Sequence, residues 1–132
     1  MTPVLPEFFL NLREWINPRP CEAIDPISKA GKPERYIEDW PGISPFIISS
    51  VLWSIYSFLR NRDSYWDAIA TAISVGGDVD TTGAVTGAIS GAWLGIEALP
   101  QHLIRILNDH GSRGYAELVA LTEICYEIKC GI

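Results

Sequence analysis

The stretch that decides the fold is Gly76-Gly77-Asp78-Val79-Asp80-Thr81-Thr82-Gly83, which places two carboxylates and two hydroxyls directly after a pair of glycines. One aspartate before a helix is accounted for by capping, because its side chain accepts hydrogen bonds from free backbone N–H groups. Two carboxylates one residue apart repel each other unless a cation or the helix N-terminus offsets their charge. The loop therefore predicts either a metal or anion site, with magnesium as the typical cation for oxygen ligands, or an elaborate helix cap.

Glycines continue beyond this loop at every fourth position, and an alanine follows each of the first three: Gly83, Gly87, Gly91 and Gly95. Residues four apart lie on one side of a helix. A glycine inside a helix costs roughly 0.5–1 kcal/mol relative to alanine, so four on one face predict that another helix approaches closely. The uninterrupted apolar stretch is too short for the ~20 residues of a membrane span, which favours packing in a soluble helical core.

Two similar motifs fail on their remaining positions. A calcium-binding loop that began at Asp78 would need a glutamate where Ile89 stands. The spacing of Asp78, Asp80 and Thr82 also resembles the start of a haloacid-dehalogenase-type phosphatase. That motif follows an apolar strand and needs a downstream lysine and acidic pair, whereas a glycine pair precedes the loop here and a glycine-striped helix follows it.

The rest of the chain predicts an all-α, compact helical array with no convincing strand. The apolar segment 46–60 has no polar face, so it should be a central helix surrounded by others. Residues 17–45 read as a long irregular connection, and the chain divides into an N-terminal part, 1–42, and a helical region, 43–132. Further helices are expected at 5–16, 64–75, 80–95, 100–110 and 113–129. The last of these should turn five residues inward: Leu118, Leu121, Thr122, Cys125 and Ile128.

Composition limits the classes of protein that the chain can belong to. At 132 residues it has the length of one domain. A net charge of −6 argues against a nucleic-acid surface. Three cysteines, an odd number, suggest buried, reduced thiols and a cytoplasmic protein, and no secretory signal is visible. His102 and His110 should be surface residues at helix ends, and no nucleophilic triad accompanies them.

The motif and its surroundings resemble one known family. Gly-Gly-Asp-Val-Asp-Thr, the glycine–alanine repeat and Ile96-Glu97-Ala98-Leu99-Pro100 are similar to the C-terminal signature of the ADP-ribosylglycohydrolase family. Upstream, Ser44-Pro45-Phe46 through Arg60 and Tyr65-Trp66-Asp67-Ala68-Ile69 resemble the two family helices before that loop. The resemblance covers about residues 43–110 and keeps the family order.

This resemblance implies an all-helical hydrolase that removes ADP-ribose from an N- or O-glycosidic conjugate with the help of a binuclear magnesium site. It carries Asp78, Asp80 and Thr81 over as metal ligands. It places Gly76, Gly77 and Ser44 on the substrate side, where the thin glycine loop lets the ligand reach the metals. No general base is visible in this chain.

The chain also departs from the family pattern. Family members are about twice as long, and their N-terminal half supplies an acidic, threonine-flanked motif to the same metals. The nearest adjacent carboxylates here, Glu38 and Asp39, have flanks that do not match. Three hypotheses follow. The chain is half of a split or truncated enzyme that needs a companion chain, a non-catalytic helical relic or interaction protein, or a self-sufficient hydrolase with substitute ligands, for example through dimerisation.

Overall fold

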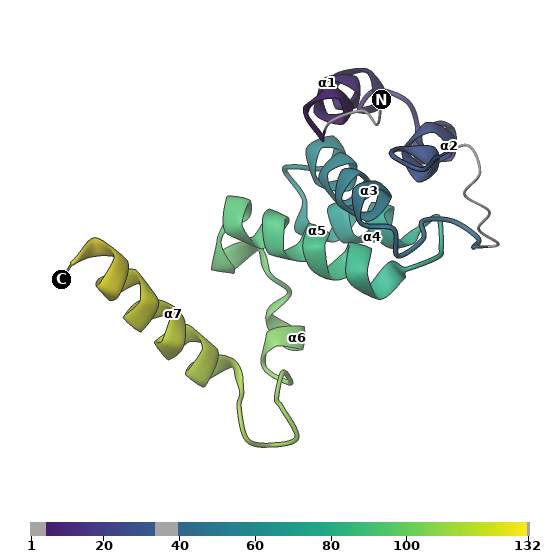
Figure 1. Cartoon of the computed structure of the whole chain (residues 1–132). Coiled ribbons are helices and arrows are strands. Elements are labelled where there is room, and N and C mark those ends of the chain that lie inside the picture. The colour runs from purple at the N-terminus through teal and green to yellow at the C-terminus, as the bar shows by residue number, and fades with distance from the viewer. Residues whose placement is uncertain (1–4, 34–39, 132) are drawn as a thin grey trace. The chain divides into compact units, whose positions relative to one another are not determined.

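The computed structural model describes residues 5–33 and 40–131, and every regular element in these ranges is helical (Figure 1). The chain divides into two compact units between Ala98 and Leu99. The first unit contains α1 (Leu5–Trp15), α2 (Pro20–Lys29), α3 (Ile47–Arg60), α4 (Tyr65–Ile73), α5 (Val79–Leu94) and the short 3-10 turn η1 (Ile96–Ala98). The second contains α6 (Gln101–Ile104) and α7 (Tyr115–Cys130). The all-α prediction is confirmed. The described residues directly before Asp78 form α4 and a turn, whereas the phosphatase alternative required a strand there.

Helix α3 is the centre of the first unit, as its apolar sequence predicted. It packs against α1, α2, α4 and α5. Trp53 and Tyr56 are fully buried and stack with ring centroids 4.9 Å apart. The Trp53 indole N–H donates to the Ala72 carbonyl of α4 at 2.9 Å, and the Tyr56 hydroxyl donates to the Pro18 carbonyl at 2.8 Å. Both aromatic residues therefore bury apolar area without leaving a polar atom unpaired.

Gly83 and Gly87 of the predicted stripe face α4, whereas Gly95 lies at the end of α5 and a Cβ there would meet no atom within 4 Å. A Cβ added to Gly87 would lie 3.1 Å from the Ile69 Cδ1 atom and 3.1 Å from the Tyr65 hydroxyl. A Cβ on Gly83 would lie 3.5 Å from Ile73. Side chains of ordinary size at these positions would push the two helices apart. Among the described residues, no helix combines the length and hydropathy that crossing a membrane requires.

Helix α2 lies within the segment that the sequence predicted to be irregular. Pro20 occupies the start of the helix, where its missing N–H costs nothing. The Arg19 backbone N–H donates to the Glu22 carboxylate at 2.9 Å, which closes the first turn. Ala23 and Ile27 are buried against the core. Burial of this apolar face outweighs the internal Pro26. Residues 34–39 of the same predicted connection lie outside the described residues.

The second unit differs from the sequence prediction in two respects. Helix α6 ends at Ile104 rather than near residue 110, because the Asn108 side chain bonds the local backbone and His110 and Gly111 take left-handed conformations. Helix α7 starts and ends close to the predicted positions, but none of its residues is buried. The residues predicted to face inward are all exposed: Leu118, Leu121, Thr122, Cys125 and Ile128.

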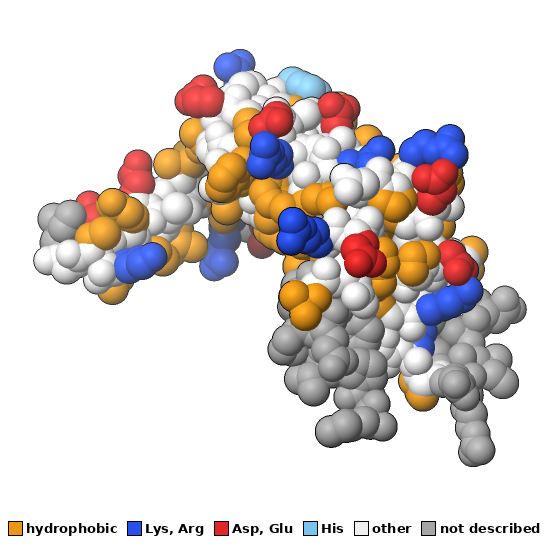
Figure 2. Space-filling model, turned by 90° about the horizontal axis from the view of Figure 1, so that it is seen from above, with side chains coloured by type: hydrophobic (Ala, Val, Ile, Leu, Met, Phe, Trp, Pro, Cys, Tyr) orange, Lys and Arg blue, Asp and Glu red, His pale blue; other side chains and the backbone are white. Residues whose placement is uncertain are grey.

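The described surface contains many large apolar side chains. In the first unit, Trp66 on α4 and Trp93 on α5 are 57% and 65% exposed. Figure 2 shows hydrophobic side chains lying between charged ones over one face of the molecule.

The prediction that the cysteines are buried is wrong, since Cys21, Cys125 and Cys130 are all exposed.

Candidate functional site

The predicted ligand loop joins α4 to α5 through the two consecutive glycines. Gly76 and Gly77 have φ angles of +74° and +88°, a region that side-chain-bearing residues rarely adopt. Asp78 then occupies the N-cap position of α5, and its carbonyl accepts hydrogen bonds from the Thr82 N–H at 3.1 Å and the Thr82 hydroxyl at 3.0 Å. The glycine pair thus turns the chain so that the aspartates stand at a helix start.

A short extended segment holds this loop in place. Ile43 forms an isolated parallel bridge with Gly77. Its N–H donates to the Gly76 carbonyl at 3.3 Å, and its carbonyl accepts the Asp78 N–H at 2.7 Å. Ile43 is fully buried, and a Cβ on Gly77 would overlap the Ile43 backbone. The loop is therefore fixed on both sides of the glycine pair by one residue that the sequence analysis did not single out.

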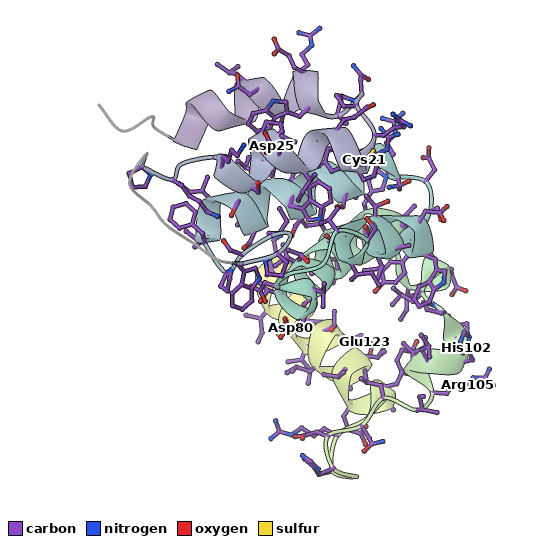
Figure 3. The ribbon with its side chains drawn as sticks, turned by 90° about the vertical axis from the view of Figure 1, so that its right-hand side faces the viewer. Cys21, Asp25, Asp80, His102, Arg105 and Glu123 are labelled. Carbon is purple, nitrogen blue, oxygen red and sulfur yellow. The ribbon has the colours of Figure 1, made fainter. Side chains whose placement is uncertain are left out.

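The three predicted metal ligands stand together at the head of α5. Asp78 is half-buried, whereas Asp80 and Thr81 are exposed; Figure 3 places Asp80 at the end of this helix. The Asp78 side chain accepts no hydrogen bond from the first helical turn. Asp78 therefore does not act as the side-chain cap that the alternative interpretation of the loop assigns to one aspartate.

Asp78 and the start of the helix both influence the ionisation of Asp80. A side-chain hydrogen bond with Asp78 is the largest cause that lowers the pKa of Asp80, followed by the backbone N–H groups of Asp80 and Thr81. A cation between two carboxylates would relieve the repulsion between their charges. Asp80 therefore interacts both with the helix N-terminus and with its acidic neighbour.

These donors fit a hard cation in kind but not in number. Carboxylate and hydroxyl oxygens are the ligands that magnesium prefers, and a magnesium ion takes six of them. The described ranges, 5–33 and 40–131, contain no group of three or more histidine, cysteine, aspartate or glutamate side chains that could hold a metal. Glu38 and Asp39 lie outside these ranges. The loop alone therefore cannot complete the coordination shell of a magnesium ion.

Ser44, the remaining predicted site residue, lies beside the loop with only 1% of its surface exposed. Its hydroxyl accepts a hydrogen bond from the Lys32 ammonium group at 2.9 Å, and its carbonyl accepts one from the Ser50 hydroxyl at 2.8 Å. Gly76 and Gly77 are half-buried. The structure therefore brings all the predicted site residues into one neighbourhood, with Ser44 linked to the loop through Ile43.

Helix α5 also has a polar face that the sequence analysis missed. Thr82, Thr86 and Ser90 recur every four residues and are buried. The Thr86 hydroxyl lies 3.4 Å from the Ser54 carbonyl of α3, and the Ser54 hydroxyl lies 3.4 Å from the Thr82 carbonyl. The signal was visible as hydroxyl residues at helical spacing in both segments. These small side chains let α3 approach α5 closely below the aspartates.

The two histidines belong to the second unit and are exposed, as predicted. His102 lies in α6, whereas His110 lies in the connection between α6 and α7 and not at the end of a helix as predicted. Figure 3 shows His102 with Arg105 on the short α6 segment. The predicted ligands in the loop itself, Asp78, Asp80 and Thr81, are all oxygen donors.

Comparison with known proteins identifies the family but no individual relative. No curated protein and no solved structure matches the chain. The family model described as ADP-ribosylglycohydrolase matches residues 4–129, which is nearly the whole of the 132-residue chain. The match is longer than the segment, about residues 43–110, in which the sequence motifs resemble the family. The chain belongs to the ADP-ribosylglycohydrolase family.

Proposed function

We propose that this chain contributes one half of the active site of a magnesium-dependent hydrolase that cleaves an ADP-ribosyl N- or O-glycosidic bond. The observation that carries the proposal is the loop itself, in which Asp78, Asp80 and Thr81 stand together at a helix start fixed by Ile43. Family membership supports the reaction class. Among the described residues, 5–33 and 40–131, the loop supplies only part of a donor set, which supports a need for further acidic ligands.

Each residue of the loop has a distinct part in this proposal. Asp78 and Asp80 hold the cation through charge and oxygen donation, and Thr81 adds a neutral hydroxyl. Gly76 and Gly77 keep the loop free of side chains, so the ribose can approach. Magnesium, when bound, would orient the ribose hydroxyls and activate a water molecule.

An open face of α5 supports a companion chain. Asp80 and Thr81 are exposed at its start, and three alanines at four-residue spacing continue the same exposed side: Ala84, Ala88 and Ala92. Residues with this spacing share one side of a helix. A second helix that packs on this smooth surface would bring its own end close to the aspartates. We call Ala84, Ala88 and Ala92 the alanine face.

The experiment is complementation with an N-terminal half that carries the family's acidic motif. The mixture should release ADP-ribose from a synthetic conjugate only with magnesium present. Asp78→Ala and Asp80→Ala should each abolish release, because each removes a ligand and a charge. Thr81→Ala should reduce release less, because water can replace a neutral hydroxyl. Asp63→Ala is the matched control, since that carboxylate is 92% exposed in the loop after α3.

Binding of the metal provides a second measurement. The chain alone should bind magnesium weakly in calorimetry, because water must supply most of the coordination shell. Tight binding by the monomer would contradict the half-site proposal and favour a self-sufficient hydrolase with substitute ligands. If the Asp78→Ala/Asp80→Ala double variant complements as well as the wild type, the loop is only a helix start and the catalytic proposal fails.

A non-catalytic helical interaction protein is the second candidate. It is favoured by the lack of a complete metal-binding group among residues 5–33 and 40–131, and by the exposed tryptophans of α4 and α5. Under this alternative, the companion binds with unchanged affinity when Asp78 and Asp80 are both replaced, and the complex releases no ADP-ribose at any magnesium concentration.

A further inference from the structure

The position of Asp78 depends on a segment that lies far from it in the sequence. The Asp78 N–H donates to the Ile43 carbonyl at 2.7 Å, which is the shorter of the two hydrogen bonds between the loop and Ile43. The backbone of residues 43 and 44 therefore sets where α5 begins. Whatever fixes this short segment also fixes the carboxylate that follows the glycine pair.

Ser44 is the residue through which that segment is fixed. It is 1% exposed, and its hydroxyl oxygen and its backbone carbonyl oxygen each accept a hydrogen bond. The carbonyl accepts from Ser50 within α3, the central helix. The hydroxyl accepts from the Lys32 ammonium group at 2.9 Å, and the Phe46 N–H lies 3.4 Å from the same oxygen. A hydrogen bond from a charged donor to a buried hydroxyl is stronger than one between neutral groups.

Lys32 is held where it can make this contact. It follows α2 directly, and its N–H donates to the Lys29 carbonyl at 3.2 Å. Its ammonium group lies 5.7 Å from the centre of the Phe46 ring, within the range of a cation–π contact. The preceding Gly31 has a φ angle of +73°, and a Cβ there would collide with the Ile48 side chain of α3. The turn after α2 is thus packed closely on α3.

We infer that Lys32 is a positioning residue for the Asp78 loop and acts through Ser44. The ammonium group holds the Ser44 hydroxyl, the Ser44 backbone holds Ile43 in register, and the Ile43 carbonyl holds the Asp78 N–H. The segment between α1 and α3 thereby contributes to the site without contacting the aspartates. Ser44, on this inference, acts as a link within the protein.

The test is native-state amide hydrogen exchange on the magnesium-free chain. Lys32→Met keeps the apolar stem of the side chain and removes the donor, and Ser44→Ala removes only the acceptor hydroxyl. Each should speed exchange of the Asp78 amide about tenfold, the factor that corresponds to loss of ~1.4 kcal/mol. The Ala68 amide at the start of α4 should keep its rate. Lys32→Arg, which retains a charged donor, should restore most of the protection.

Lys29→Met is the matched control, because Lys29 pairs with Asp25 on the exposed side of α2. The inference is overturned if Lys32→Met leaves the Asp78 amide unchanged. It is also overturned if exchange speeds up equally at the Asp78 and Ala68 amides, because that result describes a general loss of stability. If Lys32→Met does not fold, the same comparison of exchange at the Asp78 and Ala68 amides in Ser44→Ala tests the inference.

A second measurement rests on the proposed function. In the complemented enzyme, Lys32→Met should raise the magnesium concentration needed for half-maximal release of ADP-ribose about tenfold while leaving the maximal rate near that of the wild type. A lower maximal rate with unchanged magnesium dependence would contradict positioning of the metal loop. If complementation yields no activity at all, the proposed function fails, and the exchange experiment still decides the role of Lys32.

Discussion

Gly76 and Gly77 are adjacent glycines with similar φ angles and different surroundings. A Cβ on Gly76 meets no atom within 4 Å, whereas a Cβ on Gly77 would overlap the Ile43 backbone. We expect Gly76→Ala to lower the free energy of unfolding by about 1–2 kcal/mol, the cost of a left-handed residue with a side chain. Gly77→Ala should cost more, because it also displaces Ile43. Urea denaturation of both variants measures the difference, and equal losses would contradict the structure.

The residues of the loop could be singled out from the sequence because the predicted ligands fall within four positions of the chain and their spacing is specific. Asp78, Asp80 and Thr81 need no tertiary information to be recognised as a group of oxygen donors. Ile43 and the contact between Lys32 and Ser44 could not be predicted in this way. They depend on backbone pairing and side-chain contacts between distant segments, and neither leaves a pattern in composition or periodicity.

At the scale of single helices, α5 carries three different faces. Hydroxyl residues face α3 and glycines face α4, while the alanine face is open. The glycine face was predicted because glycine inside a helix is costly and needs a reason. Serine and threonine carry no comparable penalty, so their buried face was overlooked. The amphipathic pattern of α7 predicted that one of its faces is buried, but no residue of this helix is buried in the structure.

Two neighbouring positions of α5 test this division. Gly87→Leu should lower the free energy of unfolding by about 1–3 kcal/mol, because the added side chain meets Ile69 and Tyr65 across the helix interface. Ala88→Leu should change it by less than about 0.5 kcal/mol, because Ala88 is exposed. Thermal or urea unfolding compares the two variants. A larger loss from Ala88→Leu would show that the alanine face is covered within the chain.

The sequence analysis placed α2 in an irregular connection because two prolines and several charged residues are typical of loop composition. Its start depends on local electrostatics: the Arg19 guanidinium and backbone N–H both bond the Glu22 carboxylate. The Arg19 side chain is the largest cause that lowers the pKa of Glu22 below its ordinary value of 4.5. The helix thus begins with an ion pair and then buries Ala23 and Ile27.

The ion pair at the start of α2 predicts that the stability of the chain depends on pH. Because the pKa of Glu22 is lowered in the folded chain, its contribution to stability is present above pH 4.5 and is lost as the pH falls through the lower, folded value. Arg19→Ala should move the Glu22 midpoint part of the way back to 4.5, since the backbone N–H still donates. Carboxyl-detected NMR titration measures it. Glu117, whose pKa is lowered by the backbone N–H groups of Glu117 and Gly114, should not move.

At the scale of the whole chain, the two units contrast in how they are stabilised. The first has a continuous core around Trp53 and Tyr56, with Ile27 and Ile43 from the preceding segments. None of the described residues of the second unit is buried. Apolar surface left exposed to water costs roughly 25 cal/mol per Å² relative to burial. Within the second unit alone this apolar surface is uncovered, so any contact that buries it would stabilise the unit.

The alanine face provides the sharpest test of the proposed companion. Ala88→Leu should leave the isolated chain folded, because the new side chain projects into solvent. It should weaken complementation at least tenfold, since a leucine on a surface of alanines holds an approaching helix away from the aspartates. The half-maximal companion concentration for release of ADP-ribose measures the effect. Glu97→Leu, at an exposed position in η1 beyond the end of α5, is the control for added apolar surface. If Ala88→Leu complements as well as the wild type, the companion does not pack on this face and must reach Asp80 and Thr81 from another direction.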